Sequence, residues 1–550
     1  MKYHILFFLV AFSTSINAQN LQWISTGAGD AYYSENNAIA VASTDNYIYI
    51  SGHAVGDKVY IKDTTISHGD FSFIAQFDKE GNLRWIRENS GEEANDIAVN
   101  SKYEVYTFYK PSLLNHHIIK YDMNGNQLWD KELPYDIDFF KSITVDKNDN
   151  LLITGRYFTI GNSLTFEDTV IYNVEKDKTN SFVMKYDSEG RFKWFTSSKI
   201  SPFGASLEFS DLQTNDDGEA YVTGYYEIFS ENDSIQFGDF HLNSRSNPAY
   251  PENYFSGTDI VLAKLSANGE VLWAKGYGGQ RDDRGNKIAV NASGDVFMTG
   301  VYNDTVCFSN FKSAFLGFHG FLCKVNPEGV VEWANQIASN TFSNTNEQSK
   351  AVAADDNYIY VGGYYPGSWA VFGSTNLEDS MIVFNDFKHG SFLARYSPQG
   401  DFISVNHIIG DVSGIEDINL NGRSVYVAGN ALPPATIFSL PFPIVSNNHN
   451  MHFFLTSLQY DPLTGYPENN AGNISFYPNP VSGFFIIQGE SKEEITSVAI
   501  IDLKGNFLIF EKISGNYSQI DVSSLPAGMY ILKIQTTNGF EIRKLVKSNP

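Results

Sequence analysis

Hydrophobic and polar residues alternate along most of the chain in short runs that end at glycine, asparagine or aspartate turns. Alternation with a period of two, broken by such turns, predicts β-strands joined in hairpins. One hairpin recurs: an apolar strand, a tight turn and a second strand that usually ends in glycine. It first occurs as "IAVASTDNYIYISG", and its seven copies are residues 39–52, 97–109, 143–155, 212–224, 288–300, 351–363 and 418–429.

A second hairpin follows each copy of the first. In five copies it carries a tryptophan four residues after the turn glycine, as in "FIAQFDKEGNLRW", and these copies are residues 73–85, 118–129, 182–194, 261–273 and 321–333. A sixth copy, residues 392–404, has Ser404 at the tryptophan position. A seventh, residues 453–465, has its first strand but no tryptophan strand behind it. The repeats therefore predict seven units of four strands, of which the last lacks its outer strand.

The missing strand stands at the other end of the chain, in "LQWIST". Residues 21–25 placed beside residues 453–460 complete the seventh sheet, so that Trp23 belongs to the last unit. Such an overlap closes the ring and protects strand edges, and it predicts an all-β fold, a seven-bladed β-propeller. Because the tryptophans recur at one offset, we interpret them as packing between blades and not as a ring that stacks on a ligand. The same reasoning assigns a scaffold role to Tyr157, Tyr226, Tyr302 and Tyr365.

Residues 1–18, "MKYHILFFLVAFSTSINA", have the three-part layout of a secretory signal with cleavage after Ala18. Their apolar core is far shorter than the roughly twenty residues that span a bilayer. No later run is longer, so we expect an exported protein without a transmembrane segment. The chain has 38 basic and 63 acidic residues, and its net charge of -25 argues against nucleic acid as a partner. Two cysteines, Cys307 and Cys323, do not make a disulfide scaffold, and the sequence leaves open whether they pair.

The connections divide the two faces of the predicted ring. The turns inside both hairpins are short and lie on one face, whereas long and dissimilar connections, residues 158–180, 227–259, 303–320 and 366–390, lie on the other. Long loops on a rigid ring usually carry recognition, so we expect a glycan or a surface protein to bind on that face.

Signals of enzyme chemistry are weak. The stretch "DKNDN", residues 146–150, lacks the full pattern of a calcium loop, and we predict no catalytic residue, no metal site and no cofactor. Asp282 and Asp283 could serve as an acid/base pair, but related stretches of glycine and acid recur before other blade strands, which favours a structural cause.

Five tripeptides of the type Asp-Ser/Thr-apolar or a close variant occur in the long connections. They resemble an acceptor pattern for O-glycosylation in Bacteroidetes-like bacteria, whereas ordinary composition predicts about two by chance. The acceptors that this resemblance implies are Thr64, Thr169, Ser234, Thr305 and Ser380. A loop composition rich in Asp, Ser and Thr is the alternative.

Beyond residue 466, a polar linker, residues 467–472, leads to residues 473–550, which lack the propeller repeat. Their short alternating strands predict a small β-sandwich, immunoglobulin-like in class. Four motifs follow in order: "YPNP", "IDLKG", "LPAGMYIL" and "KLVK". The motif residues are Tyr477, Pro478, Asn479, Pro480, Gly505, Gly528, Tyr530, Lys544 and Lys547.

This segment resembles the type A C-terminal sorting domain of the type IX (Por) secretion system. The resemblance implies recognition by the outer-membrane translocon, removal by a sortase-like peptidase, and attachment to surface lipopolysaccharide or release. An ordinary adhesion sandwich is the alternative.

Residues 19–466 resemble bacterial seven-bladed β-propellers of the "beta-propeller repeat" type found in exported proteins. They also resemble in part the tryptophan-docking repeats of quinoprotein dehydrogenases, whose strands also end in glycine-x-x-x-tryptophan. The spacing from aspartate to glycine, as in "YDSEG", is one residue shorter here than in that family's motif. We therefore expect a cell-surface or secreted protein whose propeller serves binding or adhesion. The alternatives are a propeller enzyme that acts on glycans, a quinoprotein-like oxidoreductase that uses calcium and quinone, and a structural surface-layer protein.

Overall fold

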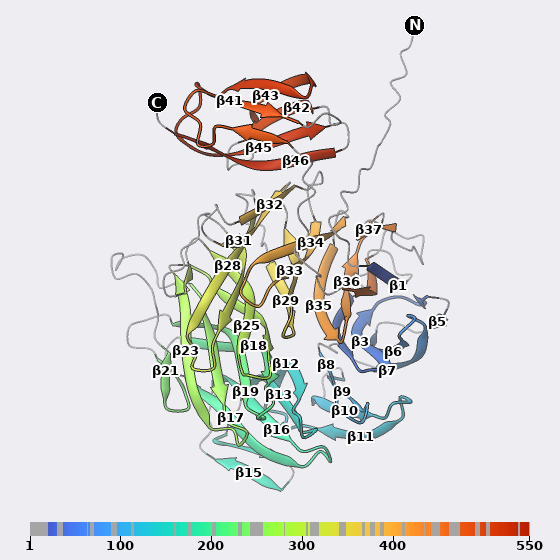
Figure 1. The fold of residues 1–550 in the computed structure, drawn as a ribbon. Coiled ribbons are helices and arrows are strands. Elements are labelled where there is room, and N and C mark those ends of the chain that lie inside the picture. Colours follow the sequence, from blue (N-terminus) through green and yellow to red (C-terminus); the bar gives the residue numbers. More distant parts are fainter. Residues whose placement is uncertain are drawn as a thin grey trace. The chain divides into compact units, whose positions relative to one another are not determined.

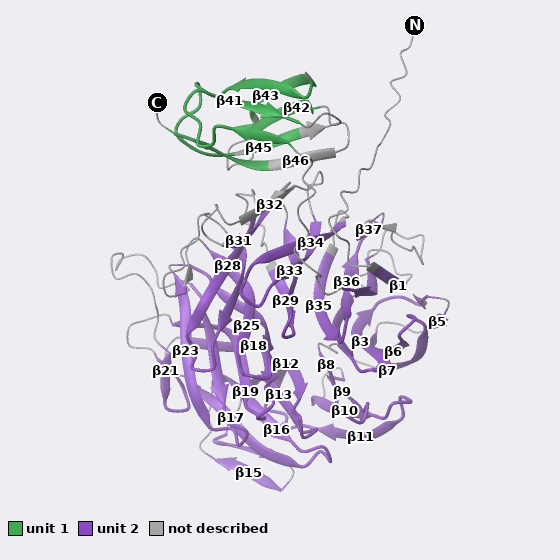
Figure 2. Ribbon diagram, viewed as in Figure 1, with its two compact units in different colours: residues 1–18, 461–550 green, residues 19–460 purple. Residues whose placement is uncertain are grey.

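The computed structural model describes residues 20–548 of the chain, apart from short stretches. The stretches it leaves out are residues 30–36, 63, 67–70, 90–95, 112–114, 159–160, 167, 173–177, 201–204, 229–233, 243–256, 280, 304–305, 309–317, 340–347, 366–368, 375–379, 385–389, 410–412, 434, 439, 442–450, 461–473, 490–494, 502–506 and 537–538. The chain divides into two compact units, residues 19–460, and residues 1–18 with 461–550 (Figure 2). All regular secondary structure in the described residues is β-strand.

Seven antiparallel sheets with four main strands each make up most of the first unit, and we call them blades 1 to 7. The four main strands of blades 1 to 4 are, in order from the ring axis outward, β2 (Asn37–Ser43), β3 (Tyr47–Ala54), β6 (Phe71–Asp78) and β7 (Leu83–Asn89); β8 (Ile97–Val99), β9 (Val105–Tyr109), β10 (His117–Tyr121) and β11 (Gln127–Glu132); β12 (Ile137–Val145), β13 (Leu151–Phe158), β16 (Thr179–Tyr186) and β17 (Phe192–Ile200); and β18 (Ala205–Thr214), β19 (Ala220–Ile228), β22 (Asp259–Leu265) and β23 (Val271–Gly279).

The main strands of blades 5 to 7 follow the same order. They are β24 (Arg284–Val290), β25 (Val296–Asn303), β27 (Phe318–Val325) and β28 (Val331–Ser339); β29 (Gln348–Ala354), β30 (Ile359–Tyr365), β33 (Gly390–Tyr396) and β34 (Phe402–Ile409); and β35 (Ser413–Asn421), β36 (Ser424–Ala431), β39 (His452–Gln459) and β1 (Asn20–Gly29).

The blades form a closed ring (Figure 1). The inner strand of each blade contacts the inner strand of the next, from β2 through β8, β12, β18, β24 and β29 to β35, and β35 in turn contacts β2. The N-terminal strand β1 is the outer strand of blade 7, with Asn20 opposite Gln459 and Gly27 opposite Phe453. Trp23 therefore lies in the seventh blade, where the repeat pattern placed it.

Several long connections add short strands to the outer strand of the preceding blade. These strands are β4 (Val59–Ile61) and β5 (Thr64–Ile66) on β1; β20 (Ile235–Phe237) and β21 (Phe240–Leu242) on β17; β26 (Val306–Cys307) on β23; β31 (Trp369–Ser374) and β32 (Ser380–Phe384) on β28; and β37 (Thr436–Ile437) and β38 (Leu440–Pro441) on β34. In blade 3 the equivalent hairpin, β14 (Ser163–Phe166) and β15 (Thr169–Tyr172), forms a separate two-stranded sheet.

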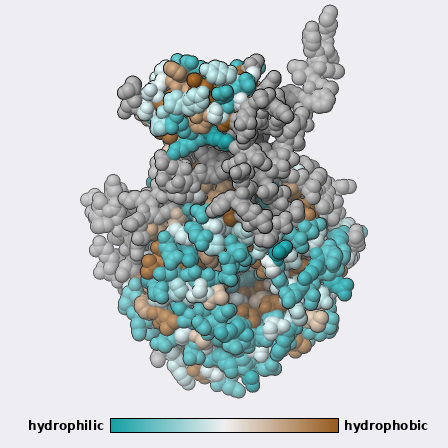
Figure 3. Space-filling model, in the orientation of Figure 1, coloured by the Kyte–Doolittle hydropathy of each residue, from teal (hydrophilic) through white to brown (hydrophobic). Residues whose placement is uncertain are grey.

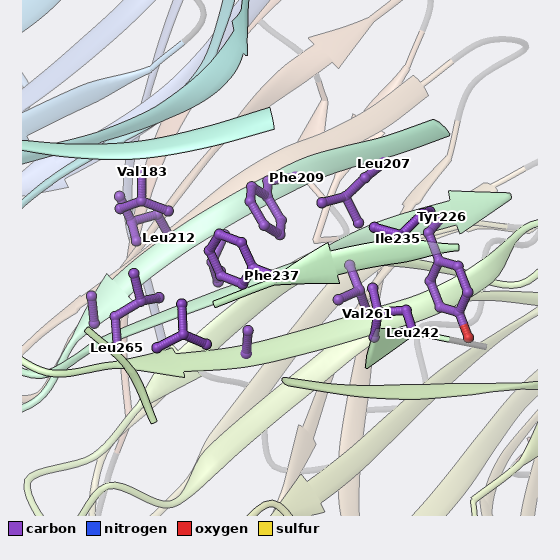
Figure 4. Close-up of a cluster of buried hydrophobic side chains, with 14 of the residues drawn as sticks. Val183, Leu207, Phe209, Leu212, Tyr226, Ile235, Phe237, Leu242, Val261 and Leu265 are labelled. Carbon is purple, nitrogen blue, oxygen red and sulfur yellow. The ribbon is translucent and has the colours of Figure 1, made fainter. Parts of the chain in front are cut away.

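Hydrophobic side chains fill the spaces between neighbouring blades. Between blades 3 and 4, Val183 of β16 packs with Leu212 and Phe209 of β18, and Phe237 of the β20–β21 hairpin covers the same cluster (Figure 4). The added hairpins thus extend the core toward the face of the long connections and protect it from water.

The second unit consists of two sheets around one core. The first sheet has the order β40 (Ser475–Tyr477), β41 (Phe484–Gln488) and β44 (Tyr517–Asp521); the second has β43 (Phe507–Gly515), β42 (Ile495–Ile501), β45 (Gly528–Thr536) and β46 (Gly539–Lys547). Phe485 and Ile487 of the first sheet share a buried cluster with Val498 and Leu532 of the second. β43, the fourth strand of this unit, pairs with β42 and not with β44. In the constant-type immunoglobulin arrangement the fourth strand pairs with the fifth. The domain boundaries at residues 466 and 472 stay predictions.

Candidate functional sites

The repeated tryptophans pack between blades. The indole N–H of Trp23 donates to the Lys79 carbonyl of the next blade at 2.6 Å, and a Cβ at Gly81 would lie 2.5 Å from the Trp23 ring. Indole groups of the same type donate to carbonyls of the following blade at Trp85, Trp194, Trp273 and Trp333. The packing interpretation is therefore confirmed, and no stacking ring for a ligand is left at these positions. The four periodic tyrosines are scaffold as well, because each is at most 1% exposed.

Around the ring axis, seven equivalent positions lie on or next to the inner strands, and four of them carry charged side chains. These positions hold Ala40, Asp96, Ser142, Asp211, Lys287, Ala351 and Asp417. Each aspartate accepts a hydrogen bond from the backbone of the next blade: Asp96 from Ile143 at 3.0 Å, Asp211 from Ile288 at 2.9 Å and Asp417 from Val41 at 2.8 Å. The carboxylates therefore tie three pairs of neighbouring blades together at the axis.

Lys287 supplies the positive charge of this cluster. Its Nζ lies 3.5 Å from Asp211 Oδ1 and 3.9 Å from Asp417 Oδ1. Burial raises the pKa of Asp417 to about 6 and also raises the pKa of Asp211; burial opposes the charge of Lys287, but the attraction of the carboxylates outweighs it and raises the pKa of Lys287. Ser142 Oγ lies within hydrogen-bond distance of both Asp96 and Asp211, at 2.8 and 3.0 Å. Because one hydroxyl has one hydrogen, Ser142 can donate to only one of these two carboxylates at a time.

The axial cluster has the arrangement of a structural ion cluster. Its aspartates are occupied by backbone amides and by Lys287, and in the described part of the chain no three His, Cys, Asp or Glu side chains are grouped to hold a metal ion. The "DKNDN" turn is also structural, because Asp146 accepts hydrogen bonds from Asn148 and Asn150 at 2.9 Å and pairs with Lys185 at 2.8 Å.

A cavity of about 430 Å³ lies at the junction of blades 2 and 3. It is lined by the end of β11 and the residues after it, by the β14–β15 hairpin and by β16; the lining residues are Asp130, Lys131, Glu132, Leu133, Pro134, Thr165, Phe166 and Tyr186. Among the junctions with a hairpin in the described residues, this is the one at which the hairpin does not pair with the outer strand of the preceding blade.

Pro134 explains why the hairpin stays apart. It stands five residues after Trp129, and at the same offset in other blades Ala28 of β1 still pairs with β4 and Lys199 of β17 still pairs with β20. Proline has no backbone N–H and does not continue a paired strand. β11 therefore ends at Glu132. The chain then turns, and the amide of Ile137 donates a hydrogen bond of 3.0 Å to the Pro134 carbonyl.

The cavity combines carboxylates, a cation, a hydroxyl and aromatic rings. Asp130 is held in place by His117 Nδ1 at 2.7 Å and by the Tyr109 hydroxyl at 3.2 Å. Burial and the nearby Asp130 carboxylate raise the pKa of Tyr109 to about 12, so that its hydroxyl keeps its proton and donates to Asp130. On the other side, Phe166 stacks on Phe192 with ring centroids 4.8 Å apart, which gives the cavity a rigid apolar wall.

Two exposed tyrosines belong to the same segments as the cavity lining. Tyr135, next to Pro134, is 83% exposed, and Tyr172 at the end of the hairpin is 71% exposed. On the side shown in Figure 3, hydrophilic side chains cover most of the described propeller surface, and hydrophobic ones form small separate groups. Solvent-exposed tyrosines on the segments that line a cavity favour a contact surface there.

The sequence pattern missed both features. The axial charges come from positions that are apolar or small in other repeats, so no local motif marks them. The cavity had one local signal, the proline at position 134 behind the tryptophan strand, but the pairing that it prevents is with a hairpin distant in sequence. Most of the connection 227–259, one of the long connections on the face where we expected binding, lies outside the described residues.

Asp282 and Asp283 do not form an exposed acid/base pair. Asp283 is buried and accepts hydrogen bonds from the backbone of Gly279 at 2.6 Å and Asn303 at 3.1 Å, while Asp282 accepts one from Thr258. Burial and the neighbouring Asp259 and Asp282 raise the pKa of Asp283 to about 8. These contacts fix the connection between blades 4 and 5, which supports the structural interpretation. Cys323 is a buried free thiol.

The described residues of the predicted O-glycosylation pattern lie at the starts of the short added strands. Thr64, Thr169 and Ser380 are the first residues of β5, β15 and β32, and Ser234 directly precedes β20. Thr64 and Thr169 are exposed. Thr305 lies outside the described residues. The modification itself stays a prediction, which the intact mass of protein from its native host would test.

Several of the described sorting-motif residues have structural contacts. Asn479 donates to the Lys544 carbonyl at 2.8 Å and accepts from the Val546 amide at 2.7 Å, so it clamps the "YPNP" segment to β46. Tyr530 is buried and its hydroxyl donates to the Pro526 carbonyl at 2.8 Å. Lys547 is buried, and its backbone pairs with Val481 in an isolated parallel β-bridge. Gly505 lies outside the described residues.

Family models match parts of both units. Residues 475–548 match the secretion system C-terminal sorting domain, and residues 35–194 match the arylsulfotransferase (ASST) family. An uncharacterized WD repeat-containing protein of Acanthamoeba polyphaga mimivirus is 23% identical over 381 residues, which are 58% of this chain and 26% of that protein. The chain thus spans about a quarter of that relative.

Solved structures are also similar. The Dos1 propeller is 10% identical with a TM-score of 0.38 and covers 80% of this chain and 96% of its own. Sqt1 of Saccharomyces cerevisiae is 7% identical with a TM-score of 0.38, over 81% of this chain and 100% of its own. PorZ, a surface component of the type IX secretion system of Porphyromonas gingivalis, is 10% identical with a TM-score of 0.16, over 94% of this chain and 100% of its own. None of the described residues form a helix long and apolar enough to cross a membrane.

Proposed function

We propose that this chain, an exported β-propeller protein with a type IX secretion C-terminal sorting domain, is a glycan-binding protein. The sorting domain indicates secretion by the type IX system to the cell surface or beyond it. Removal of this domain by a sortase-like peptidase after residue 466, and attachment to surface lipopolysaccharide, belong to the same proposal. The observation that carries the binding role is the cavity at the junction of blades 2 and 3.

The chemistry of the cavity supports a sugar as its ligand. Sugar hydroxyls donate hydrogen bonds that the carboxylates of Asp130 and Glu132 accept, and Thr165 adds a hydroxyl. The C–H faces of a sugar ring pack on aromatic side chains, which Tyr135 and Tyr172 present to solvent. A volume of about 430 Å³ lies within the usual range of ligand pockets.

The position of the cavity supports recognition as well. The β14–β15 hairpin belongs to a long connection, so part of the cavity wall is specific to this blade. The short turns of the opposite face are occupied by their own hydrogen bonds, for example from Asn124 and Asn126 to Asp122 at 2.8 Å.

Titration calorimetry of the full chain against a panel of oligosaccharides tests this function. We expect one sugar class to bind. Glu132→Gln should weaken its affinity by about tenfold, because a hydrogen bond to a charged group contributes about 1.5–3 kcal/mol. Tyr135→Ala should weaken it as well, because it removes an aromatic ring on which the sugar packs. Glu270→Gln and Leu272→Ala in blade 4 are the matched controls and should leave the affinity unchanged. Binding of a protein ligand only, or of a sugar whose affinity neither cavity variant changes, would contradict the proposal.

A sulfuryl-transfer enzyme is the second candidate, favoured by the arylsulfotransferase match over blades 1 to 3. In this reaction the S–O bond of an aryl sulfate breaks, a new S–O bond forms to a phenol hydroxyl, and the proton of the phenol is released. The test is the release of 4-nitrophenol from 4-nitrophenyl sulfate by the full chain. Release that depends on an added phenol acceptor supports the enzyme, and no release above the buffer rate removes this candidate.

A further inference from the structure

The C-terminal unit exposes large hydrophobic side chains on the outside of its first sheet. Tyr477 is 48% exposed, Phe484 49% and Tyr517 55%. A small domain buries its apolar residues in its core, as Phe485, Ile487 and Ile520 of the same strands do. Exposed aromatic residues beside such a complete core indicate a contact surface.

The strand register places these side chains on one side of the sheet. Tyr477 lies opposite Ile486, and Ile486 lies opposite Gln519. Phe484 is two residues from Ile486 on β41, and Tyr517 lies opposite Gln488, the next residue on the same side. Because side chains alternate along a strand, all of them face away from the core. We call Tyr477, Phe484, Ile486 and Tyr517 the aromatic face.

The other motif residues do not offer a comparable surface. Asn479 is used by the clamp on β46, and Tyr530 is buried with its hydroxyl on the Pro526 carbonyl. Of the two motif tyrosines, Tyr477 is about half exposed, whereas Tyr530 is buried. The motif therefore builds the domain, while Tyr477 also extends the aromatic face.

We propose that the aromatic face is the surface by which the sorting domain docks on the type IX secretion machinery. The proposal rests on the secretion part of the proposed function and is independent of the glycan ligand. The occupant is a protein surface with apolar side chains, since aromatic residues dominate the centres of protein interfaces. Gln488, Gln519 and Asp521 on the same side of the sheet provide the polar rim.

The opposite sheet supplies a matched control. Leu508 and Phe510 on β43 are 41% and 59% exposed. They lie on the second sheet, on the side away from Ile509, which packs against the core. Removing them changes the exposed apolar surface by a similar amount without touching the aromatic face.

Secretion of the full chain by a host with type IX machinery tests the proposal. We expect the double variant Phe484→Gln, Tyr517→Gln to lower the ratio of secreted and surface protein to retained protein by about tenfold or more, as expected for the loss of two aromatic contacts at an interface centre. The variant Leu508→Gln, Phe510→Gln should be secreted like the wild type. Thermal unfolding of both purified variants checks that the domain still folds.

Normal secretion of the aromatic-face variant would overturn the proposal, and so would an equal loss with both pairs. A wild-type chain that is not secreted would instead refute the export route itself. Glycan binding by the retained protein is measured separately, so a failure of one proposal does not imply a failure of the other.

Discussion

At the scale of single residues, two features require glycine at position 81: its backbone conformation and the ring that packs on it. Gly81 has φ of +75°, and its Cα faces the Trp23 ring of the preceding blade. Gly422 has φ of +57°, but a Cβ there would meet nothing within 4 Å. We expect Gly422→Ala to cost about 1–2 kcal/mol of backbone strain. Gly81→Ala should cost about 1–3 kcal/mol more, because the ring must move.

Urea unfolding followed by tryptophan fluorescence measures this difference. All seven tryptophans precede residue 370, so their fluorescence reports on the propeller and not on the sorting domain. Equal losses of stability in the two variants would show that the ring does not pack on the glycine.

Asp283 makes stability depend on pH. Its folded pKa of about 8 lies above the ordinary value of 3.8, so the folded state binds the proton more tightly than the unfolded state. Its contribution to stability is therefore full below about pH 4, falls by up to about 1.4 kcal/mol per pH unit, and is lost above about pH 8. Asp283→Asn removes this titration.

The free energy of unfolding at pH 5 and pH 8 checks the sign. We expect the wild type to lose more stability between these values than Asp283→Asn, while the exposed control Asp217→Asn behaves like the wild type. A wild type and an Asp283→Asn variant that change in parallel would contradict the raised pKa.

At the scale of elements, one proline decides whether a hairpin joins a blade. Pro134→Thr restores a backbone N–H where β11 stops, and threonine favours strands. We expect the variant to extend β11 and to bring the β14–β15 hairpin into the sheet. Hydrogen exchange of residues 163–172 should then slow, and the affinity for the sugar should fall as the cavity closes. Unchanged exchange would show that Pro134 is not what keeps the hairpin apart.

Elements also mark how far the sequence can predict this fold. The main strands follow from alternation and turns: residues 39–52 become β2 and β3, and the glycine-to-tryptophan spacing identifies the outer strands. The added hairpins were not predicted, because strands of three residues such as β4 and β20 are too short for alternation to show. Their partners belong to another blade, so local propensity carries no information about the pairing.

At the scale of the whole molecule, closure of the ring was predictable from the two ends of the repeat array. The last repeat lacks its outer strand, and the first strand, with Trp23, has no hairpin of its own. The axial cluster was not. Lys287 and Asp417 are 130 residues apart and face each other only because the ring brings inner strands together. The partner of a charged residue in one repeat lies in another blade, so no single repeat predicts the ion pair.

The closing strand should therefore contribute to the stability of the entire ring. β1 pairs with β39 on one side and with β4 on the other, and Trp23 covers Gly81 of blade 1. Deletion of residues 19–29 exposes two strand edges and removes this packing at once. We expect the free energy of unfolding of the propeller to fall by at least as much as for the loss of one large core side chain, on the order of 3–5 kcal/mol.

Tryptophan fluorescence in urea measures this loss, and a synthetic peptide of residues 19–29 should restore part of it when it is added in trans. Deletion of residues 467–550 is the control, since it removes a separate compact unit and should leave the unfolding of the propeller unchanged. If removal of β1 had no larger effect than this control, the ring would hold without the strand. The overlap of the two ends would then not be what keeps seven blades in one closed fold.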